Sequence, residues 1–327
     1  MNAREVALAV IRDVFEESTR RRIHGAQESL NYHLRRASLE LRDRAFATEL
    51  AYGAIKMRRT VEWYLRPYLS DRTRALPEII GEILRLGVYE IQFMDFRAHA
   101  TVSESVNLAK KYGHAGTAGL VNAVLRRLLR DRPRPPQRAA FEDENDYLAT
   151  RYSFPTWMVG RWRAQFPAAS IEDMLQGMNL PAQAAVRVNL MRTSIDAVVT
   201  ELQIVGVVVE RSQFVPEVLV VQAGLVPQEC EEKAQGRWSL QSEAAAMPVD
   251  ILNPQPGEAV LDLCSGRGNK AVQIASRMQN EGLLLCVEQS KTKENTLRRR
   301  LEEAGAFGAR SRAADARELD GGEQFDR

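Results

Sequence analysis

Residues Ala259 to Ile274 read AVLDLCSGRGNKAVQI, and this stretch decides the fold class of the chain. Its first five residues, Ala259–Leu263, are mostly apolar, which is typical of a strand buried on both faces of a parallel sheet. Ser265–Asn269 is too rich in glycine for a strand or a helix, and Lys270–Arg277 has apolar residues at helical spacing. Strand, glycine-rich turn and helix predict the first half of a βαβ unit, whose turn and helix N-terminus favour an anionic ligand.

Acidic residues also follow the next two predicted strands. Leu283–Val287 predicts a second buried strand followed by Glu288, and Ala309–Ala313 predicts a third strand before Asp315. Parallel strands end at one edge of a sheet, so these acids and Asp262 are expected to gather where such folds bind ligands. The arrangement resembles the S-adenosylmethionine (SAM) pocket of a class I methyltransferase. The alternative is an ordinary doubly wound fragment whose acids stand at helix N-caps.

The composition is that of a globular protein. The chain has 327 residues, 45% of them hydrophobic and 27% charged, which allows two or three domains with ample cores. No apolar run reaches membrane-spanning length, and the charged N-terminus predicts an amphipathic helix instead of a signal peptide. The three cysteines lie far in sequence from the four histidines, which predicts neither a metal site nor a disulfide framework. A reducing cytoplasm is the expected setting.

Net charge is distributed unevenly along the chain. Residues 1–140 carry 25 Lys and Arg against 16 Asp and Glu, whereas residues 141–327 carry 20 against 27. The basic residues of the first segment are nearly all arginine, and the guanidinium group suits bidentate phosphate binding. This segment therefore indicates a polyanionic partner, with Arg20–Arg22 and Arg126–Arg127 as the leading clusters. A solvated helical surface is the open alternative.

Residues 1–132 are expected to form an all-α bundle. Apolar residues recur at helical spacing over Arg4–Glu16 and over most of Arg42–Leu69. Thr101 is expected to cap a further helix, with Glu104 reaching back to it.

Four motifs stand in order along this segment, at Glu49–Gly53, Ile83–Glu90, His99–Val106 and Val121–Arg126. Together they resemble the NusB-like helical domain. In that family the domain is an RNA-binding or protein-docking bundle. His99 and Asn122 could be polar ligands, but they are better interpreted as buried or capping groups at helix junctions.

The rest of the chain is expected to consist of a linker and two further domains. Residues 133–146 are expected to be a linker, because three prolines among charged residues cannot continue a helix. Residues 147–235 alternate short helices and strands, which predicts a small α+β domain. Residues 236–327 are expected to be the first part of a Rossmann-like α/β methyltransferase domain.

Three further motifs are found at Tyr152–Trp157, Val186–Asn189 and Trp238–Ala244. They resemble the RsmB/Sun (Fmu) family of small-subunit ribosomal RNA cytosine-C5 methyltransferases. The family joins a NusB-like domain, a small RNA-contacting domain and a SAM-dependent Rossmann domain in this order, so the resemblance covers essentially the whole chain. It implies SAM as cofactor, ribosomal RNA as partner, a monomer, and no membrane or metal.

The resemblance also implies roles for particular residues. The loop that holds the methionine end of SAM corresponds to Cys264, Ser265, Gly266, Arg267, Gly268, Asn269 and Lys270. The ribose-binding acid matches Glu288 and the adenine-side acid matches Asp315, with Asp262 ending the first strand. The family's loop carries Ala-Ala-Pro-Gly-Gly-Lys, so Arg267 adds a charge here. The family's two catalytic cysteine motifs are expected to lie beyond Arg327.

Those missing motifs matter for the chemistry. Methylation at cytosine C5 needs a thiolate that adds to C6 and makes C5 nucleophilic. Cys264 and Cys286 are expected to be packing residues, and the acids beside Cys230 would raise its thiol pKa. This chain by itself is therefore expected to be inactive. The alternative function is a non-catalytic RNA-binding, ribosome-assembly or antitermination-type factor.

One structural consequence is expected at the sheet edge. Class I methyltransferases order their strands 3-2-1-4-5-7-6, so the strand at Ala259–Leu263 belongs in the middle. With strand four beginning after Arg327, Val260 and Leu261 are expected on an open edge with unpaired backbone groups.

Overall fold

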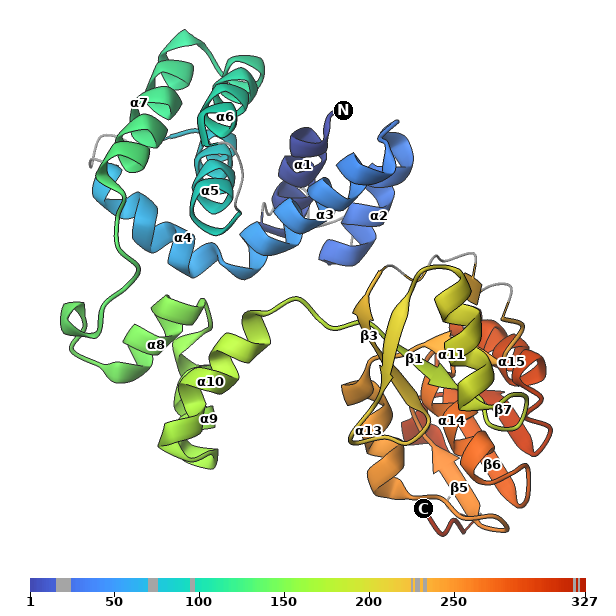
Figure 1. The fold of residues 1–327 in the computed structure, drawn as a ribbon. Coiled ribbons are helices and arrows are strands. Elements are labelled where there is room, and N and C mark those ends of the chain that lie inside the picture. The colour runs from blue at the N-terminus through green and yellow to red at the C-terminus, as the bar shows by residue number, and fades with distance from the viewer. Residues whose placement is uncertain are drawn as a thin grey trace. The chain divides into compact units, whose positions relative to one another are not determined.

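The computed structural model describes the chain apart from residues 16–24, 70–75, 95–97, 225, 227–229, 232–233, 320–321 and 323. The structure divides into two compact units, Met1–Leu180 and Pro181–Arg327. Figure 1 shows their helices and strands. Within the described ranges no helix is both long and apolar enough to cross a membrane.

The first unit begins with helices packed around one apolar core, which confirms the predicted all-α bundle. The helices are α1 (Ala3–Phe15), α2 (Ala26–Arg36), α3 (Leu41–Lys56), α4 (Arg58–Leu65), α5 (Glu78–Phe93), α6 (Ala98–Tyr112) and α7 (Ala115–Asp131), with a 3-10 turn η1 (Arg66–Tyr68) after α4. Leu50, Ile83 and Leu125 are fully buried in this core and come from α3, α5 and α7. The arginine cluster Arg20–Arg22 lies outside the described residues.

Two predictions about polar residues of the bundle are wrong. Thr101 does not cap a helix: it lies inside α6, and its hydroxyl donates to the buried carboxylate of Glu90, 2.6 Å away. His99 is exposed on α6, and Asn122 accepts from Arg126 within α7, so neither holds a helix junction. The histidine that caps a helix is His114, whose Nδ1 accepts from the second backbone N–H of α7.

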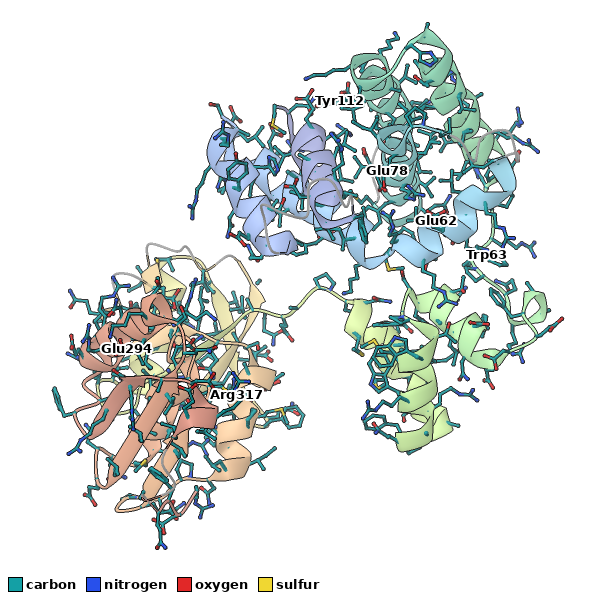
Figure 2. All side chains as sticks on the ribbon, turned by 180° about the vertical axis from the view of Figure 1, so that it is seen from behind. Glu62, Trp63, Glu78, Tyr112, Glu294 and Arg317 are labelled. Carbon is teal, nitrogen blue, oxygen red and sulfur yellow. The ribbon has the colours of Figure 1, made fainter. Side chains whose placement is uncertain are left out.

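Three more helices complete the first unit. They are α8 (Glu144–Tyr152), α9 (Thr156–Gln165) and α10 (Ala168–Asn179), preceded by a 3-10 turn η3 (Arg138–Ala140). Arg59 of α4 ties them to the bundle by donating to Thr150, Thr156 and the carbonyl of Phe154. Trp63 of the same helix stacks on Phe141, with ring centroids 4.8 Å apart (Figure 2).

The second unit begins with a small antiparallel sheet of order β2-β3-β1-β4. Its elements are β1 (Ala185–Val188), α11 (Ile195–Ile204), β2 (Val208–Arg211), β3 (Val218–Ala223) and β4 (Trp238–Leu240). The unit boundary falls inside the range 147–235 expected for one α+β domain, and β4 lies after that range but pairs with β1. The expected domain boundaries stay a prediction.

The rest of the unit is a parallel α/β layer, as the sequence predicted. Its order is β5-β6-β7, with Ala259 opposite Leu283 and Leu284 opposite Ala309. The elements are β5 (Ala259–Asp262), β6 (Leu283–Glu288), β7 (Ala309–Ala313), the helices α13 (Glu243–Leu252), α14 (Asn269–Arg277) and α15 (Lys291–Ala304), and a 3-10 turn η4 (Ala316–Glu318). Val260, Ile274, Cys286 and Leu297 are buried together between these strands and helices.

The expected open edge of β5 is wrong in one respect. The Leu261 N–H donates to the Arg327 carbonyl at 2.9 Å, and the N–H of Asp326 donates to the Ala259 carbonyl at 2.8 Å. The last residues of the sequence therefore pair with β5, and the backbone amide of Leu261 is satisfied.

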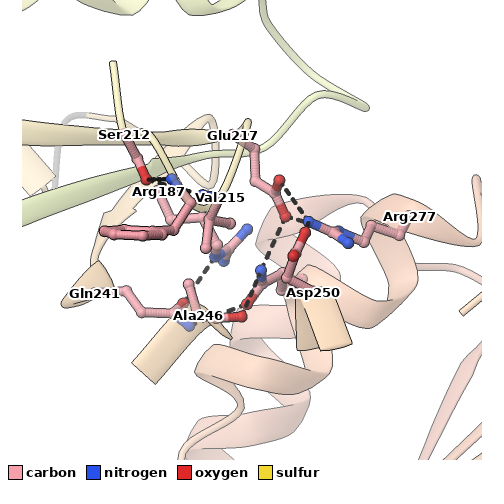
Figure 3. A network of polar contacts seen from close by, with 10 residues as sticks. Arg187, Ser212, Val215, Glu217, Gln241, Ala246, Asp250 and Arg277 are labelled. Carbon is pink, nitrogen blue, oxygen red and sulfur yellow. Dashed lines mark hydrogen bonds and ion pairs between the residues drawn. The ribbon is translucent and has the colours of Figure 1, made fainter. Parts of the chain in front are cut away.

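A buried polar network joins the small sheet to helices α13 and α14 (Figure 3). Glu217, just before β3, accepts from Arg277 of α14 twice at 2.8 Å and from Gln273 at 2.9 Å. Arg277 also donates to Asp250 of α13 at 2.6 Å. Because Glu217 and Gln273 are almost completely buried, this network fixes how the small sheet sits on the helices.

Candidate cofactor site

Three carboxylates stand at the carboxyl edge of the parallel sheet. Asp262 ends β5, Glu288 ends β6, and Asp315 follows β7 by two residues. The strands are hydrogen-bonded neighbours in parallel register, so their ends lie along one edge. This is the edge at which open α/β sheets bind ligands.

The glycine-rich loop is folded by its own backbone and by Asp262. The Ser265 hydroxyl donates to the Asp262 carbonyl at 2.9 Å. Gly266 and Gly268 have φ of +58° and +91°, a region that suits glycine. A Cβ on Gly268 would also lie 2.7 Å from a methyl group of Leu297 on α15. The loop therefore needs glycine at position 268 both for its turn and for packing.

Helix α14 begins directly after this loop. Its N-cap residue is Gly268, and among the described residues no side chain caps the helix. Its first backbone N–H groups therefore remain available to an acceptor, and the helix dipole favours an anionic one.

Glu288 connects the second strand to the loop. One carboxylate oxygen accepts from the Gly266 N–H at 3.0 Å, and the other accepts from the Ser290 N–H at 2.9 Å. A carboxylate oxygen can accept more than one hydrogen bond, so Glu288 keeps capacity for hydroxyl donors. The sequence predicted Glu288 at this edge but not its bond to Gly266.

The surroundings of Asp262 and Asp315 shift the pKa values of the two carboxyl groups in opposite directions. Burial raises the pKa of Asp262, against the lowering effect of the Cys264 N–H, the Ser265 hydroxyl and the Lys270 charge. Hydrogen bonds from the Arg317 side chain and backbone lower the pKa of Asp315.

Two residues of the Asp315 surroundings were not predicted from the sequence. Arg317 pairs with Asp315 at 2.6 Å, and Gln289 donates to the same carboxylate at 3.1 Å. Arg317 is labelled in Figure 2. Glu294, also labelled there, accepts from Ser311 of β7. The only sequence signals for Gln289 and Arg317 were their positions: Gln289 directly follows Glu288, and Arg317 lies two residues after Asp315.

The cysteines differ from each other in exposure. Cys286 is buried in β6, and burial raises its pKa to about 12, so it is the packing residue that the sequence predicted. Cys264 is exposed, which makes its predicted packing role wrong, because the chain has left the sheet when it reaches this residue. Cys230 is half-buried beside the small-sheet core. Arg267 of the glycine-rich loop and Lys270 in the first turn of α14 are exposed.

Three family models match successive segments of the chain. Residues 1–130 match the NusB family, and residues 154–226 match the ferredoxin-like domain of RsmF/B-like methyltransferases. Residues 249–327 match the 16S rRNA methyltransferase RsmB/F family. The three matches follow the order that the sequence motifs predicted.

Curated relatives share this similarity over most of the chain. It is 29% identical over 296 residues to a probable ribosomal RNA small subunit methyltransferase B of Bacillus subtilis, covering 89% of this chain and 65% of that protein. It is 33% identical over 288 residues to the ribosomal RNA small subunit methyltransferase B of Thermus thermophilus, covering 87% and 59%. The chain thus spans about three fifths of the length of these relatives.

A solved structure shares the fold. The crystal structure of PH0851 superposes with a TM-score of 0.68 at 20% sequence identity, covering 97% of this chain and 70% of that one. At this identity the likeness supports the fold alone.

Proposed function

Because this chain belongs to the RsmB/F family of 16S rRNA methyltransferases, we propose that it serves SAM-dependent methylation of cytosine C5 in small-subunit ribosomal RNA. The observation that supports cofactor binding most directly is the hydrogen bond between Gly266 of the loop and Glu288 at the end of β6. It brings a diol acceptor and an uncapped helix N-terminus to one edge of the sheet.

The residues present fit the cofactor. In this proposal Glu288 accepts from the ribose hydroxyls, and Cys264 through Lys270 surround the methionine end, whose carboxylate suits the N-terminus of α14. Asp315, held by Arg317 and Gln289, lies on the adenine side, and Asp262 supports the loop from β5. When bound, SAM would supply an electrophilic methyl group.

The reaction needs a reactive thiolate as its nucleophile. Cys286 is unsuited because it is buried with a raised pKa. Cys264 stands in the proposed cofactor loop and Cys230 beside the small-sheet core. We therefore assign the nucleophile to cysteine motifs outside this sequence, as the family resemblance implies, and expect no methyl transfer by residues 1–327 alone.

RNA binding is proposed for the basic first segment. Arg126 and Arg127 lie on α7, and the Arg127 side chain is 59% exposed, so phosphate groups can reach it. The proposed setting is the cytoplasm and the proposed form a monomer.

Calorimetric titration with SAM tests the cofactor site. Glu288→Ala removes a charged acceptor and should weaken SAM binding at least about tenfold. Glu281→Ala, an exposed acid after α14, is the matched control and should bind as the parent does. Parent-like affinity of a folded Glu288→Ala chain would remove this residue from the site. RNA binding without any SAM binding would favour the assembly-factor alternative.

A further inference from the structure

A cavity lies within the second unit, between the small sheet and helices α14 and α15. Its volume is about 770 Å³. Four arginines line it: Arg187 of β1, Arg192 just after it, and Arg299 and Arg300 of α15. Of the predicted cofactor residues, Gly268 and Asn269 reach its wall. The cavity is thus largely separate from the acids at the ends of β5, β6 and β7.

Arg187 is the unusual residue of this cavity, because it is 2% exposed and yet its guanidinium is only partly hydrogen-bonded. Its Nε donates to Gln241 at 2.8 Å and its Nη2 donates to Ser239 at 3.3 Å. Its Nη1 is buried and has no hydrogen-bond partner among the described residues. Burial lowers the pKa of Arg187 to about 10, so the group stays charged at neutral pH. A buried donor of this kind is costly unless an acceptor reaches it.

The acids of the cavity do not supply that acceptor. Glu303 pairs with Arg299 at 3.6 Å, and Glu231 accepts from the Leu240 N–H at 3.0 Å. Arg300 donates to the Asn269 side chain, which places a second guanidinium at the N-terminus of α14. The cavity therefore presents a buried cation and a half-buried cation. Both favour an oxyanion.

We propose that this cavity binds a phosphate group, with Arg187 Nη1 as its buried donor and Arg300 as a further contact. The phosphate could belong to an RNA strand or be a free phosphate group, because both present the same acceptor oxygens. This site goes beyond the proposed cofactor site, because its central residue belongs to the small sheet.

The test compares variants of residues 1–327 at low ionic strength. Arg187→Lys keeps the charge but loses the planar fork, and Arg300→Gln removes the second cation without touching the Gln241 and Ser239 bonds. Arg298→Gln, which changes an exposed arginine of α15 outside the cavity wall, is the matched control. Inorganic phosphate is titrated calorimetrically, and a single-stranded RNA hexamer is followed by fluorescence anisotropy with and without competing phosphate. Melting temperatures and SAM affinity are measured on the same samples.

Both cavity variants should weaken phosphate binding about tenfold, while Arg298→Gln stays near the parent. Equal weakening of hexamer binding, together with competition by phosphate, would identify RNA as the source. If only the binding of inorganic phosphate is weakened, a free phosphate group is identified as the ligand. The proposal is overturned if the parent chain binds neither probe, or if folded Arg300→Gln and Arg187→Lys bind both as the parent does. If Arg187→Lys does not fold, the binding of both probes by Arg300→Gln decides the outcome of the test. SAM affinity reports on the cofactor site separately, so the two proposals can fail independently.

Discussion

Replacing Glu217 by glutamine should selectively weaken the attachment of the small sheet to α14. Glu217 is 5% exposed and receives two hydrogen bonds from Arg277 and one from Gln273. The substitution removes the charge and leaves Arg277 with Asp250 as its acidic partner. Breaking a buried pair costs about 3–5 kcal/mol, and the retained Asp250 contact places this case near the lower value, about 3 kcal/mol.

The effect should depend on pH in a definite direction. Burial raises the pKa of Glu217, but hydrogen bonds from Arg277 and Gln273 outweigh burial and hold the pKa below its usual value of 4.5. A carboxyl group whose pKa is lowered by folding stabilises the fold above its unfolded pKa, and this contribution is lost as pH falls through the folded pKa. The difference in stability between the parent and Glu217→Gln should therefore be largest at pH 7 and become smaller below about pH 4.5.

Hydrogen exchange followed by mass spectrometry measures, on the intact chain, how far Glu217→Gln weakens the attachment of the small sheet to α14. Peptides from β3 and α14 should lose protection at pH 7, whereas peptides from α1 to α7 should not change. Glu210→Gln on exposed β2 is the matched control, since among the described residues its side chain accepts only a surface hydrogen bond from Gln222. Equal protection of β3 and α14 in the two variants would refute the reasoning, as would a Glu217→Gln defect that persists undiminished at low pH.

Three further outcomes are expected. Gly53→Ala should destabilise the bundle by about 1–3 kcal/mol in urea unfolding, because a Cβ there would lie 1.8 Å from the Tyr89 hydroxyl oxygen. Gly119→Ala, with nothing within 4 Å in the described structure, should not destabilise it, and equal losses would contradict the packing argument. In the native chain at pH 8, a thiol reagent should modify Cys264 well before Cys286, because the pKa of the buried Cys286 thiol is about 12; early labelling of Cys286 would count against its burial. Replacing Arg126 and Arg127 with glutamine should reduce the slope of log binding constant against log salt for RNA by roughly 1.5, and an unchanged slope would place the RNA contacts elsewhere.

The order of elements in the sheet domain was predictable from local patterns. Apolar runs and the glycine-rich turn between Ala259 and Arg277 specify strand, turn and helix, because burial on both faces and positive φ leave direct marks in a sequence. The same patterns placed Asp262, Glu288 and Asp315 at strand ends, since parallel strands share one carboxyl edge. The order of bundle, small sheet and α/β layer followed from motifs that the family models then matched.

Tertiary packing decided which distant residues meet. Arg187 lies in the sequence motif Val186–Asn189, and only the fold buries it, bonds it to Gln241 and leaves Nη1 without a hydrogen-bond partner among the described residues. Thr101 read as a cap but lies against Glu90, and the edge of β5 read as open but is paired by Arg327. Sequence periodicity reports whether a side chain is buried, because burial repeats with the local backbone. It does not report the partner, because hydrogen-bond partners are chosen by packing between segments far apart in the chain.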